Sequence, residues 1–274
     1  MYHGANNNSV AYNLWKMPSD ETFFHYAVVT LFLITPPTYL SCRYTTAPYG
    51  RHHRKGWGPT IPSSLAWFLM ESPTVWFTLV LFPLGQHKSN PKSIILISPF
   101  LFHYIHRTFI YPLRIYRSKK QYPVSIALMA FIYNLFNSYL QTRWVSQYAD
   151  DYESDVWFWI RFCCGLLVFT VGMFVNVRSD MMLVRLKKKD DNVKNGYKIP
   201  RNGLFEYVSC ANYFGEIVEW FGWAVMTGSW VGLGFMLYTC ANLVPRAVAN
   251  HKWYLEKFGE DYPKQRKAVF PFLY

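Results

Sequence analysis

Seven apolar stretches recur along this chain of 274 residues, each about the length of a helix that crosses a bilayer, roughly 20 residues. They cover residues 23–42, 62–84, 93–111, 124–142, 156–177, 204–227 and 230–244. The polar segments between them are too short to separate domains, and the chain has no internal repeat. The pattern predicts an all-α polytopic membrane protein with seven transmembrane helices, forming one domain over residues 1–274.

Positive charges alternate between the segments that separate these stretches. The segments 43–60, 113–123, 178–203 and 246–274 hold 4, 4, 8 and 6 Lys and Arg residues, whereas the first 22 residues and the loops 85–92, 143–155 and 228–229 hold 1, 2, 1 and 0. Cytosolic loops accumulate positive charge. We therefore expect a lumenal N-terminus and a cytosolic C-terminus, with no cleaved signal peptide because the first residues lack a basic n-region and a cleavage site.

The composition excludes two broad classes of protein. With 51% apolar and 20% aromatic residues, the chain is too apolar to be intrinsically disordered. The net charge of +12 falls on the predicted cytosolic face, and no soluble basic domain remains that would bind nucleic acid.

The sequence gives little support for a metal site. The five cysteines form no C-x-x-C motif, and no histidine lies at metal-ligand spacing from any of them. His103 and His106 lie close together in the third apolar stretch, but no third ligand follows at a suitable distance. Helix packing is therefore the favoured interpretation of the two histidines.

One apolar stretch contains polar residues that a membrane-buried helix accepts only at a cost. The segment "SCANYFGEIVEW" spaces Ser209, Asn212, Glu216 and Glu219 along one helical face. If the helix starts where the stretch starts, the last three lie roughly 12, 18 and 22 Å deep. A carboxylate at that depth needs a partner or a polar cavity. The alternative is a polar contact between helices, with Asn212 bonded to Glu216.

Polar residues of other stretches converge on the same depth. Glu71 lies about ten residues into the second stretch, next to a proline that opens the helix. Tyr104 and Arg107 share a helix face in the third stretch. Asn176 and Asp180 lie one turn apart at the cytosolic end of the fifth. A cavity open to the cytosol accounts for all of them.

A basic rim is expected around the mouth of that cavity. Loop 178–203 carries Tyr197 among its eight Lys and Arg residues, and Arg246 follows the last apolar stretch. Such a rim attracts a phosphorylated ligand, although basic residues at a cytosolic face also follow the positive-inside rule alone. The G-x-G-x-x-G fingerprint and the P-loop are absent, so a nucleotide would be held by a different architecture.

Four long motifs resemble a known family. They are "YKIPRNGLFEYVSCANYFGEIVEWFGWA" (197–224), "NVRSD" (176–180), "FHYIHRTFIYPL" (102–113) and "HKWYLEKFGEDYPKQRKAVFPFLY" (251–274). They closely resemble the steroid 5-alpha-reductase family, and the tail is similar to its plant branch, the brassinosteroid-pathway enzymes of the de-etiolated type. The resemblance covers essentially the whole chain.

The resemblance implies an endoplasmic-reticulum enzyme with seven transmembrane helices. Such an enzyme takes NADPH from the cytosol and reduces the 4,5 double bond of a 3-oxo-4-ene steroid. By motif matching, Glu71 and Tyr104 contact the steroid 3-keto oxygen, and Trp67 and Met70 line the substrate. The residues matched to the cofactor are Arg107, Asn176, Asp180, Tyr197, Asn212, Glu216, Arg246 and Tyr254. Membrane lipid is the only other partner implied, and no protein partner is inferred.

The implied chemistry suits these residues. Addition at C5 of a conjugated enone pushes negative charge onto the 3-oxygen, so a positioned donor lowers the barrier. Tyr104 supplies a hydroxyl donor, while Glu71 either donates as the neutral acid or orients Tyr104.

Two departures from the androgen-reducing members bear on the substrate. Those members usually have glutamine where this chain has Met70, and a run of histidines where it has Ala249-Asn250-His251. The first change alters the lining next to the ketone. A sterol with a long side chain, of the campestenone type, fits the plant-like motifs better.

Two other functions are compatible with parts of the sequence. A related membrane enoyl-CoA or polyprenol reductase shares a similar tail, but Glu71 beside a ketone-binding Tyr104 argues against it. A seven-span receptor or channel has the same topology, but the chain lacks the D-R-Y and N-P-x-x-Y signatures.

Overall fold

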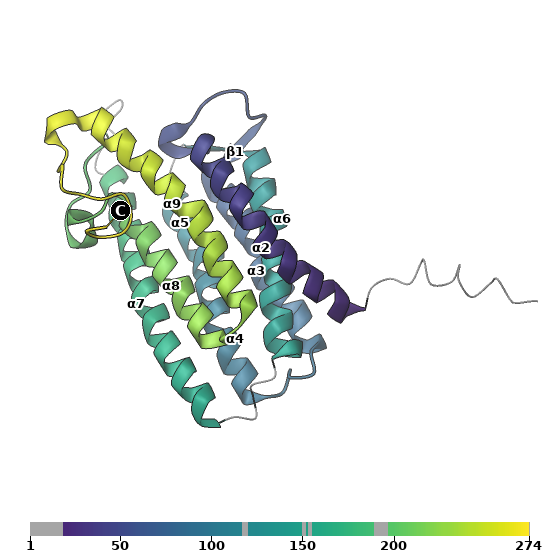
Figure 1. Ribbon diagram of the computed structural model, residues 1–274. Coiled ribbons are helices and arrows are strands. Elements are labelled where there is room, and N and C mark those ends of the chain that lie inside the picture. Colours follow the sequence, from purple (N-terminus) through teal and green to yellow (C-terminus); the bar gives the residue numbers. More distant parts are fainter. Residues whose placement is uncertain (1–18, 117–119, 150–151, 153–154, 189–196, 274) are drawn as a thin grey trace, which may run out of the picture.

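The computed structural model describes residues 19–116, 120–149, 152, 155–188 and 197–273, and in them long helices dominate (Figure 1). The long helices are α2 (Asp20–Tyr44), α3 (Ser63–Leu81), α4 (Pro91–Ile105), α6 (Val124–Arg143), α7 (Asp155–Lys188), α8 (Ala211–Thr227) and α9 (Trp230–Phe258). Shorter elements join them: α5 (Tyr111–Ile115), the 3-10 turns η1 (Gly50–His52), η2 (Phe82–Leu84), η5 (Gly203–Glu206) and η6 (Gly259–Asp261), and the π-helical turns η3 (His106–Ile110) and η4 (Trp144–Tyr148).

Five helical segments in the described part of the chain are long and apolar enough to cross a membrane. They are Asp20–Tyr44, Ser63–Leu84, Pro91–Ile115, Val156–Leu186 and Trp230–Asp261. Of the other two long helices, α8 has 17 residues and α6 buries a row of polar side chains. The predicted all-α, multi-pass membrane protein is confirmed, whereas seven crossings and their orientation stay predictions.

The sequence misplaced the start of α8 and the end of α9. The helix expected from 204 begins at Ala211, because the preceding backbone pairs with the C-terminal segment: Ser209 N–H donates to the Lys267 carbonyl at 2.8 Å, and Lys267 N–H donates to Tyr207 at 2.9 Å. The depths expected for Asn212, Glu216 and Glu219 assumed a helix from residue 204, whereas Asn212 lies in the first turn of α8. The last helix, expected to end near 244, continues to Phe258.

Glycines bring α7 and α8 into close contact. A Cβ on Gly172 would lie 2.2 Å from the Glu219 backbone nitrogen, and one on Gly215 would lie 2.4 Å from that of Asn176. Gly165 and Gly222 repeat this relation two turns further along. With no side chain at these positions, the two backbones approach closely, as small residues allow in membrane helices.

A proline interrupts α3 beside Glu71 without ending the helix. Pro73 has no N–H to donate to the Leu69 carbonyl, and the Ser72 hydroxyl donates to that carbonyl instead, at 3.1 Å. The helix therefore continues to Leu81.

A two-stranded antiparallel sheet lies at the start of α3 and α6. Strand β1 (Thr60–Pro62) pairs with β2 (Gln121–Pro123), with Ile61 opposite Tyr122. The pairing ties the segment before α3 to the segment before α6, at the end of the bundle where Figure 1 labels β1.

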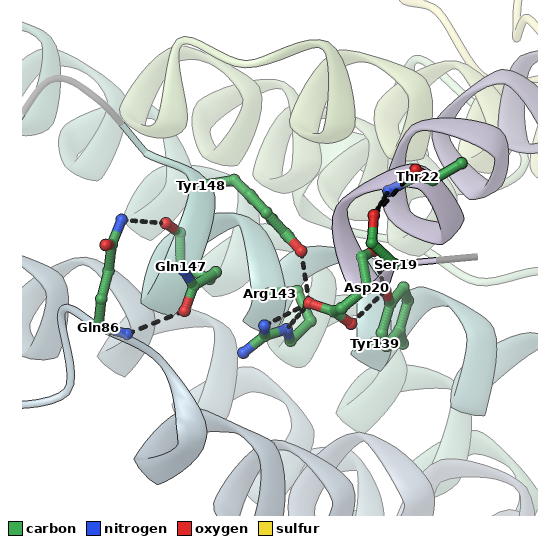
Figure 2. Close-up of polar contacts among 8 residues, drawn as sticks. All are labelled: Ser19, Asp20, Thr22, Gln86, Tyr139, Arg143, Gln147 and Tyr148. Atoms are coloured by element: carbon green, nitrogen blue, oxygen red, sulfur yellow. Dashed lines mark hydrogen bonds and ion pairs between the residues drawn. The ribbon is translucent and has the colours of Figure 1, made fainter. Parts of the chain in front are cut away.

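The N-terminal end of α2 is fastened to α6 and η4, as Figure 2 shows. Asp20 accepts hydrogen bonds from Arg143, from the Tyr139 hydroxyl at 3.0 Å and from the Tyr148 hydroxyl. Ser19 caps the helix by accepting from the Thr22 N–H at 3.2 Å. We refer to Asp20, Tyr139, Arg143 and Tyr148 as the α2 clasp.

Candidate active site

A cavity of about 1430 Å³ lies among the helices of the bundle. Ten of the twelve residues predicted for the site line it: Trp67, Met70, Glu71, Tyr104, Arg107, Asp180, Tyr197, Asn212, Glu216 and Arg246. The other two, Asn176 and Tyr254, are buried and contact residues of the wall. Segments far apart in the sequence thus contribute to one space.

A chain of hydrogen bonds links α7 and α8 at one side of the cavity. The Asn176 amide donates to Glu216 at 3.2 Å and to the Asn212 carbonyl at 3.0 Å. The Asn212 amide donates to Asp180 at 3.0 Å, and Arg107 donates to the other Asp180 oxygen at 2.9 Å. The sequence alternative of a bond between Asn212 and Glu216 is replaced by this bridge through Asn176. Both carboxylates are therefore held in place by named donors.

Arg107 joins this chain to the aromatic wall. Its guanidinium lies 4.4 Å from the ring centre of Trp67 and 4.8 Å from that of Tyr111. Its ion pair with Asp180 is almost fully buried, at 8% and 10% side-chain exposure. An arginine so enclosed keeps its geometry, since leaving either partner alone would bury an uncompensated charge.

Glu71 is positioned by α6. The Asn134 amide donates to the Glu71 carboxylate at 3.2 Å and to the Met70 carbonyl at 2.6 Å. The second bond fixes the amide against the helix backbone, so Glu71 is held at the cavity wall beside Met70.

Tyr104 is positioned by aromatic packing. Its ring stacks on Trp220 with centroids 5.7 Å apart and packs against Phe100 at 4.7 Å. Only 4% of Tyr104 is exposed, yet it lines the cavity. The phenol ring is therefore held rigidly at the wall of a space that a ligand can fill.

Two arginines form a basic end of the cavity. Arg246 donates to the Tyr49 hydroxyl, and its Nε is buried without a hydrogen-bond partner among the described residues. Arg51 lies 4.5 Å from the Tyr254 ring centre and 4.9 Å from that of Trp253, and its Nη1 is likewise unpartnered there. Because both arginines line the cavity, this end is suited to an anionic ligand.

Tyr197 belongs to the same rim. Lys120 donates to its hydroxyl at 3.0 Å, and its ring packs edge-on against Trp253 at 4.8 Å. The basic residues Lys189 and Lys194 of the predicted rim lie outside the described residues.

Glu219 and His103 form a separate buried pair. Their Oε1 and Nδ1 atoms are 2.7 Å apart, and Glu219 is fully buried while His103 lines the cavity. Glu219 thus faces a helix partner rather than the cavity. Within the described residues no group of three potential metal ligands is found.

Sequence reasoning missed Asn134 and Arg51. A signal existed for Asn134, because α6 carries a helical row of polar residues, all buried: Asn134, Asn137, Ser138, Gln141 and Thr142. Arg51 gave no such signal, since it lies in a loop where basic residues are expected at any cytosolic face.

Comparison with known proteins identifies the family. The sequence pattern described as 3-oxo-5-alpha-steroid 4-dehydrogenase matches residues 120–274. Steroid 5-alpha-reductase DET2 of Gossypium hirsutum is 65% identical over 261 residues, which cover 94% of this chain and 100% of that protein. The chain belongs to the 3-oxo-5-alpha-steroid 4-dehydrogenase family.

Within the 3-oxo-5-alpha-steroid 4-dehydrogenase family, the chain is more similar to these plant members than to the human protein. DET2 of Arabidopsis thaliana is 58% identical over 261 residues, covering 93% of this chain and 98% of that protein. The Homo sapiens protein named 3-oxo-5-alpha-steroid 4-dehydrogenase 1 is 41% identical over 242 residues, covering 85% and 88%. The resemblance to the family and to its plant branch is confirmed.

Proposed function

We propose that this chain is an NADPH-dependent steroid 5-alpha-reductase that converts a 3-oxo-4-ene steroid to the 5-alpha-3-oxosteroid. Membership of the family supports steroid 5-alpha reduction. The observation that carries the proposal is the common cavity, which Glu71 and Tyr104 line together with the polar chain of Arg107, Asp180 and Glu216. A donor pair for a ketone and a polar cradle for a cofactor occupy one space.

The residues present fit NADPH. The cavity, at about 1430 Å³, exceeds the size of pockets that hold one drug-sized ligand, so it has room for a cofactor and a steroid. Arg51 and Arg246 line the cavity with two guanidinium groups, which suit phosphates. Glu216, with its partner Asn176, offers acceptor and donor groups suited to a carboxamide. Tyr197 and Tyr254 support the basic end through Lys120 and Arg51.

The residues of the chain would act on the steroid in two ways. NADPH, when bound, supplies the hydride that the reduction requires. Tyr104 donates a hydrogen bond to the 3-oxygen as negative charge develops there, and the rigid stacking on Trp220 keeps that donor preorganised. Glu71, held by Asn134, is the second group at the oxygen, as a donor or by orienting Tyr104. Tyr104 is buried and Glu71 half-buried, and the exclusion of water strengthens these interactions.

The substrate we propose is a sterol with a long alkyl side chain, of the campestenone type. The similarity to the two plant DET2 proteins supports this choice. The cavity wall is also apolar between α2 and α6, at Ile34, Pro37, Ile126 and Met129, where an alkyl chain can be buried. Met70 lines the cavity beside Glu71.

We further propose seven membrane crossings with a lumenal N-terminus, in the endoplasmic reticulum, as one domain over residues 1–274. The alternating loop charge supports the orientation. On this topology the basic end of the cavity, with Arg51 and Arg246, opens to the cytosol, the compartment from which we expect the cofactor to be taken.

The test is reduction of a 3-oxo-4-ene sterol by protein purified in detergent with NADPH, with the C5 stereochemistry of the product determined. We expect the 5-alpha product, and a lower rate when an androgen-type 3-oxo-4-ene replaces the sterol. Reduction of an enoyl-CoA or a polyprenol in place of any steroid would contradict the proposal and support the related reductase. If the purified protein does not bind NADPH, the proposed cofactor is wrong.

A further inference from the structure

We propose that His103 and Glu219 together deliver the proton that C4 of the steroid receives in the second half of the reduction. The inference rests on the proposed function. The groups assigned above, Glu71 and Tyr104, act on the 3-oxygen. Addition at C5 leaves an enolate, and the saturated ketone forms only when its C4 carbon is protonated.

Protonation at carbon needs a donor in a different place from the donors at oxygen. Hydrogen bonds to a carbonyl oxygen lie near the plane of the carbonyl group. A proton reaches an enolate carbon from above or below that plane, where the π electrons are. A second donor beside Tyr104, but separate from it, meets this requirement.

His103 has the required position. It is the residue next to Tyr104 on α4, it lines the cavity, and the centres of the two rings lie 4.9 Å apart. C4 is bonded to the carbon that carries the 3-oxygen, so a group next to the phenol that holds this oxygen lies near C4.

The imidazole is held on three sides. Glu219 contacts Nδ1 at 2.7 Å, Trp220 packs edge-on at 4.6 Å, and Tyr104 packs edge-on at 4.9 Å. With Nδ1 engaged, Nε2 is the ring nitrogen left to act on a ligand. A carboxylate that fixes the tautomer and orientation of a histidine is a recurrent arrangement where histidine transfers protons.

Glu219 is otherwise hard to explain. It is completely buried and does not line the cavity, and its Oε2 has no hydrogen-bond partner among the described residues. A packing contact alone would be served as well by an amide or an apolar side chain, without an unsatisfied oxygen. Proton exchange with His103 would explain why position 219 has a carboxyl group.

The step balances in atoms and charge. Before it, the pair is neutral overall and holds two protons, one on Nε2 and one between Nδ1 and Glu219. The Nε2–H bond breaks and its electron pair stays on the ring, while the enolate electron pair forms the C4–H bond and the C3 carbonyl returns. The pair keeps one proton and a negative charge, which lies in the field of Arg107. A proton entering from the cavity restores the neutral pair.

The test compares His103→Gln and Glu219→Gln with wild-type protein. Glutamine keeps a polar side chain of similar size at each position but cannot relay the proton. We expect turnover to fall by roughly a hundredfold or more, the usual contribution of general acid catalysis. We also expect the solvent deuterium isotope effect on turnover to rise, because proton delivery becomes rate-limiting. NADPH affinity, measured by titration, should be unchanged.

His106→Gln is the matched control. His106 lies three residues further along, is buried and does not line the cavity. We expect its turnover and isotope effect to match wild type.

Near-normal turnover of both variants would overturn the inference. A loss of turnover with an unchanged isotope effect would also overturn it, because a pair that only holds the helices together affects all steps alike. If His103→Gln loses NADPH binding, Glu219→Gln decides by the same measurements. Loss of NADPH binding in both would show that the pair is a structural tie and overturn the inference. A wild-type protein that reduces no steroid would instead overturn the proposed function.

Discussion

At the scale of single residues, Tyr104 is the side chain whose loss should separate chemistry from binding. Tyr104→Phe keeps the ring that stacks on Trp220 and removes only the hydroxyl. We expect turnover to fall by roughly a hundredfold or more, the usual cost of losing one oxyanion donor, with little change in NADPH affinity. Single-turnover reduction of a 3-oxo-4-ene sterol measures this. A near-normal rate would remove Tyr104 from the mechanism.

Glu71 allows a graded comparison at the same end of the cavity. Glu71→Gln retains a group that can donate to the ketone, whereas Glu71→Ala removes that group and one of the two acceptors of the Asn134 amide. We expect the glutamine variant to be the more active of the two. Equal activity in the same single-turnover assay would mean that Glu71 contributes no hydrogen bond there.

Substitution of Glu216 tests the proposed NADPH-binding part of the cavity. It accepts from Asn176, and together they present polar groups to the cavity. Glu216→Ala should weaken NADPH binding while the protein stays folded and membrane-inserted. Titration of the purified variant with NADPH checks this, and unchanged affinity would leave Glu216 as a packing residue.

At the scale of elements, the close approach of α7 and α8 is the feature that sets the polar chain. A Cβ at Gly172 would lie 2.2 Å from the Glu219 nitrogen, so Gly172→Ala must push the helices apart. We expect a loss of stability of about 1–3 kcal/mol, the usual cost of overpacking, together with weaker NADPH binding because Asn176 moves away from Glu216. Thr170→Ala, on the exposed face of α7, is the control. If Gly172→Ala has the melting temperature and the NADPH affinity of the wild-type protein, α7 and α8 tolerate the added methyl group.

The α2 clasp should contribute to stability but not to chemistry. Asp20→Ala removes the acceptor that pairs with Arg143, whose side chain is only 11% exposed. Because the Asp20 side chain is itself half exposed, we expect a modest fall in melting temperature, about 2–4 °C, with unchanged NADPH affinity. Glu21→Ala, next to it and 71% exposed, should melt like wild type. Equal melting of the two variants would mean that the clasp is energetically neutral.

Residue spacing within one element predicts the apolar helices, and the similar depth of polar residues in several of these helices predicts that the site residues converge. It could not predict the start of α8, since the apolar segment before it is held by Lys267 rather than by helical bonds. Nor could it pair Glu219 with His103, which are brought together by helix packing. Contacts between distant elements leave no periodic trace in the sequence.

At the scale of the whole molecule, the orientation in the membrane is the testable property. The 22 basic residues of four segments against 4 in the others predict a cytosolic tail after Arg246. A glycosylation acceptor engineered near Tyr274 should remain unmodified in microsomes, whereas one in the loop 143–155 should be modified. The opposite pattern would invert the topology and place the basic end of the cavity in the lumen.

The pairing of the C-terminal segment with residues 207–210 has a consequence for biosynthesis. Helices α7 and α8 are made before α9, but the backbone that leads into α8 is fixed by Lys267 and Ala268, which the ribosome adds only after α9. The nascent chain can therefore insert its apolar helices before the first turn of α8, which carries Asn212, reaches its final conformation. We therefore expect the cavity wall around Asn212 to take its final form only after the C-terminal segment has been synthesised.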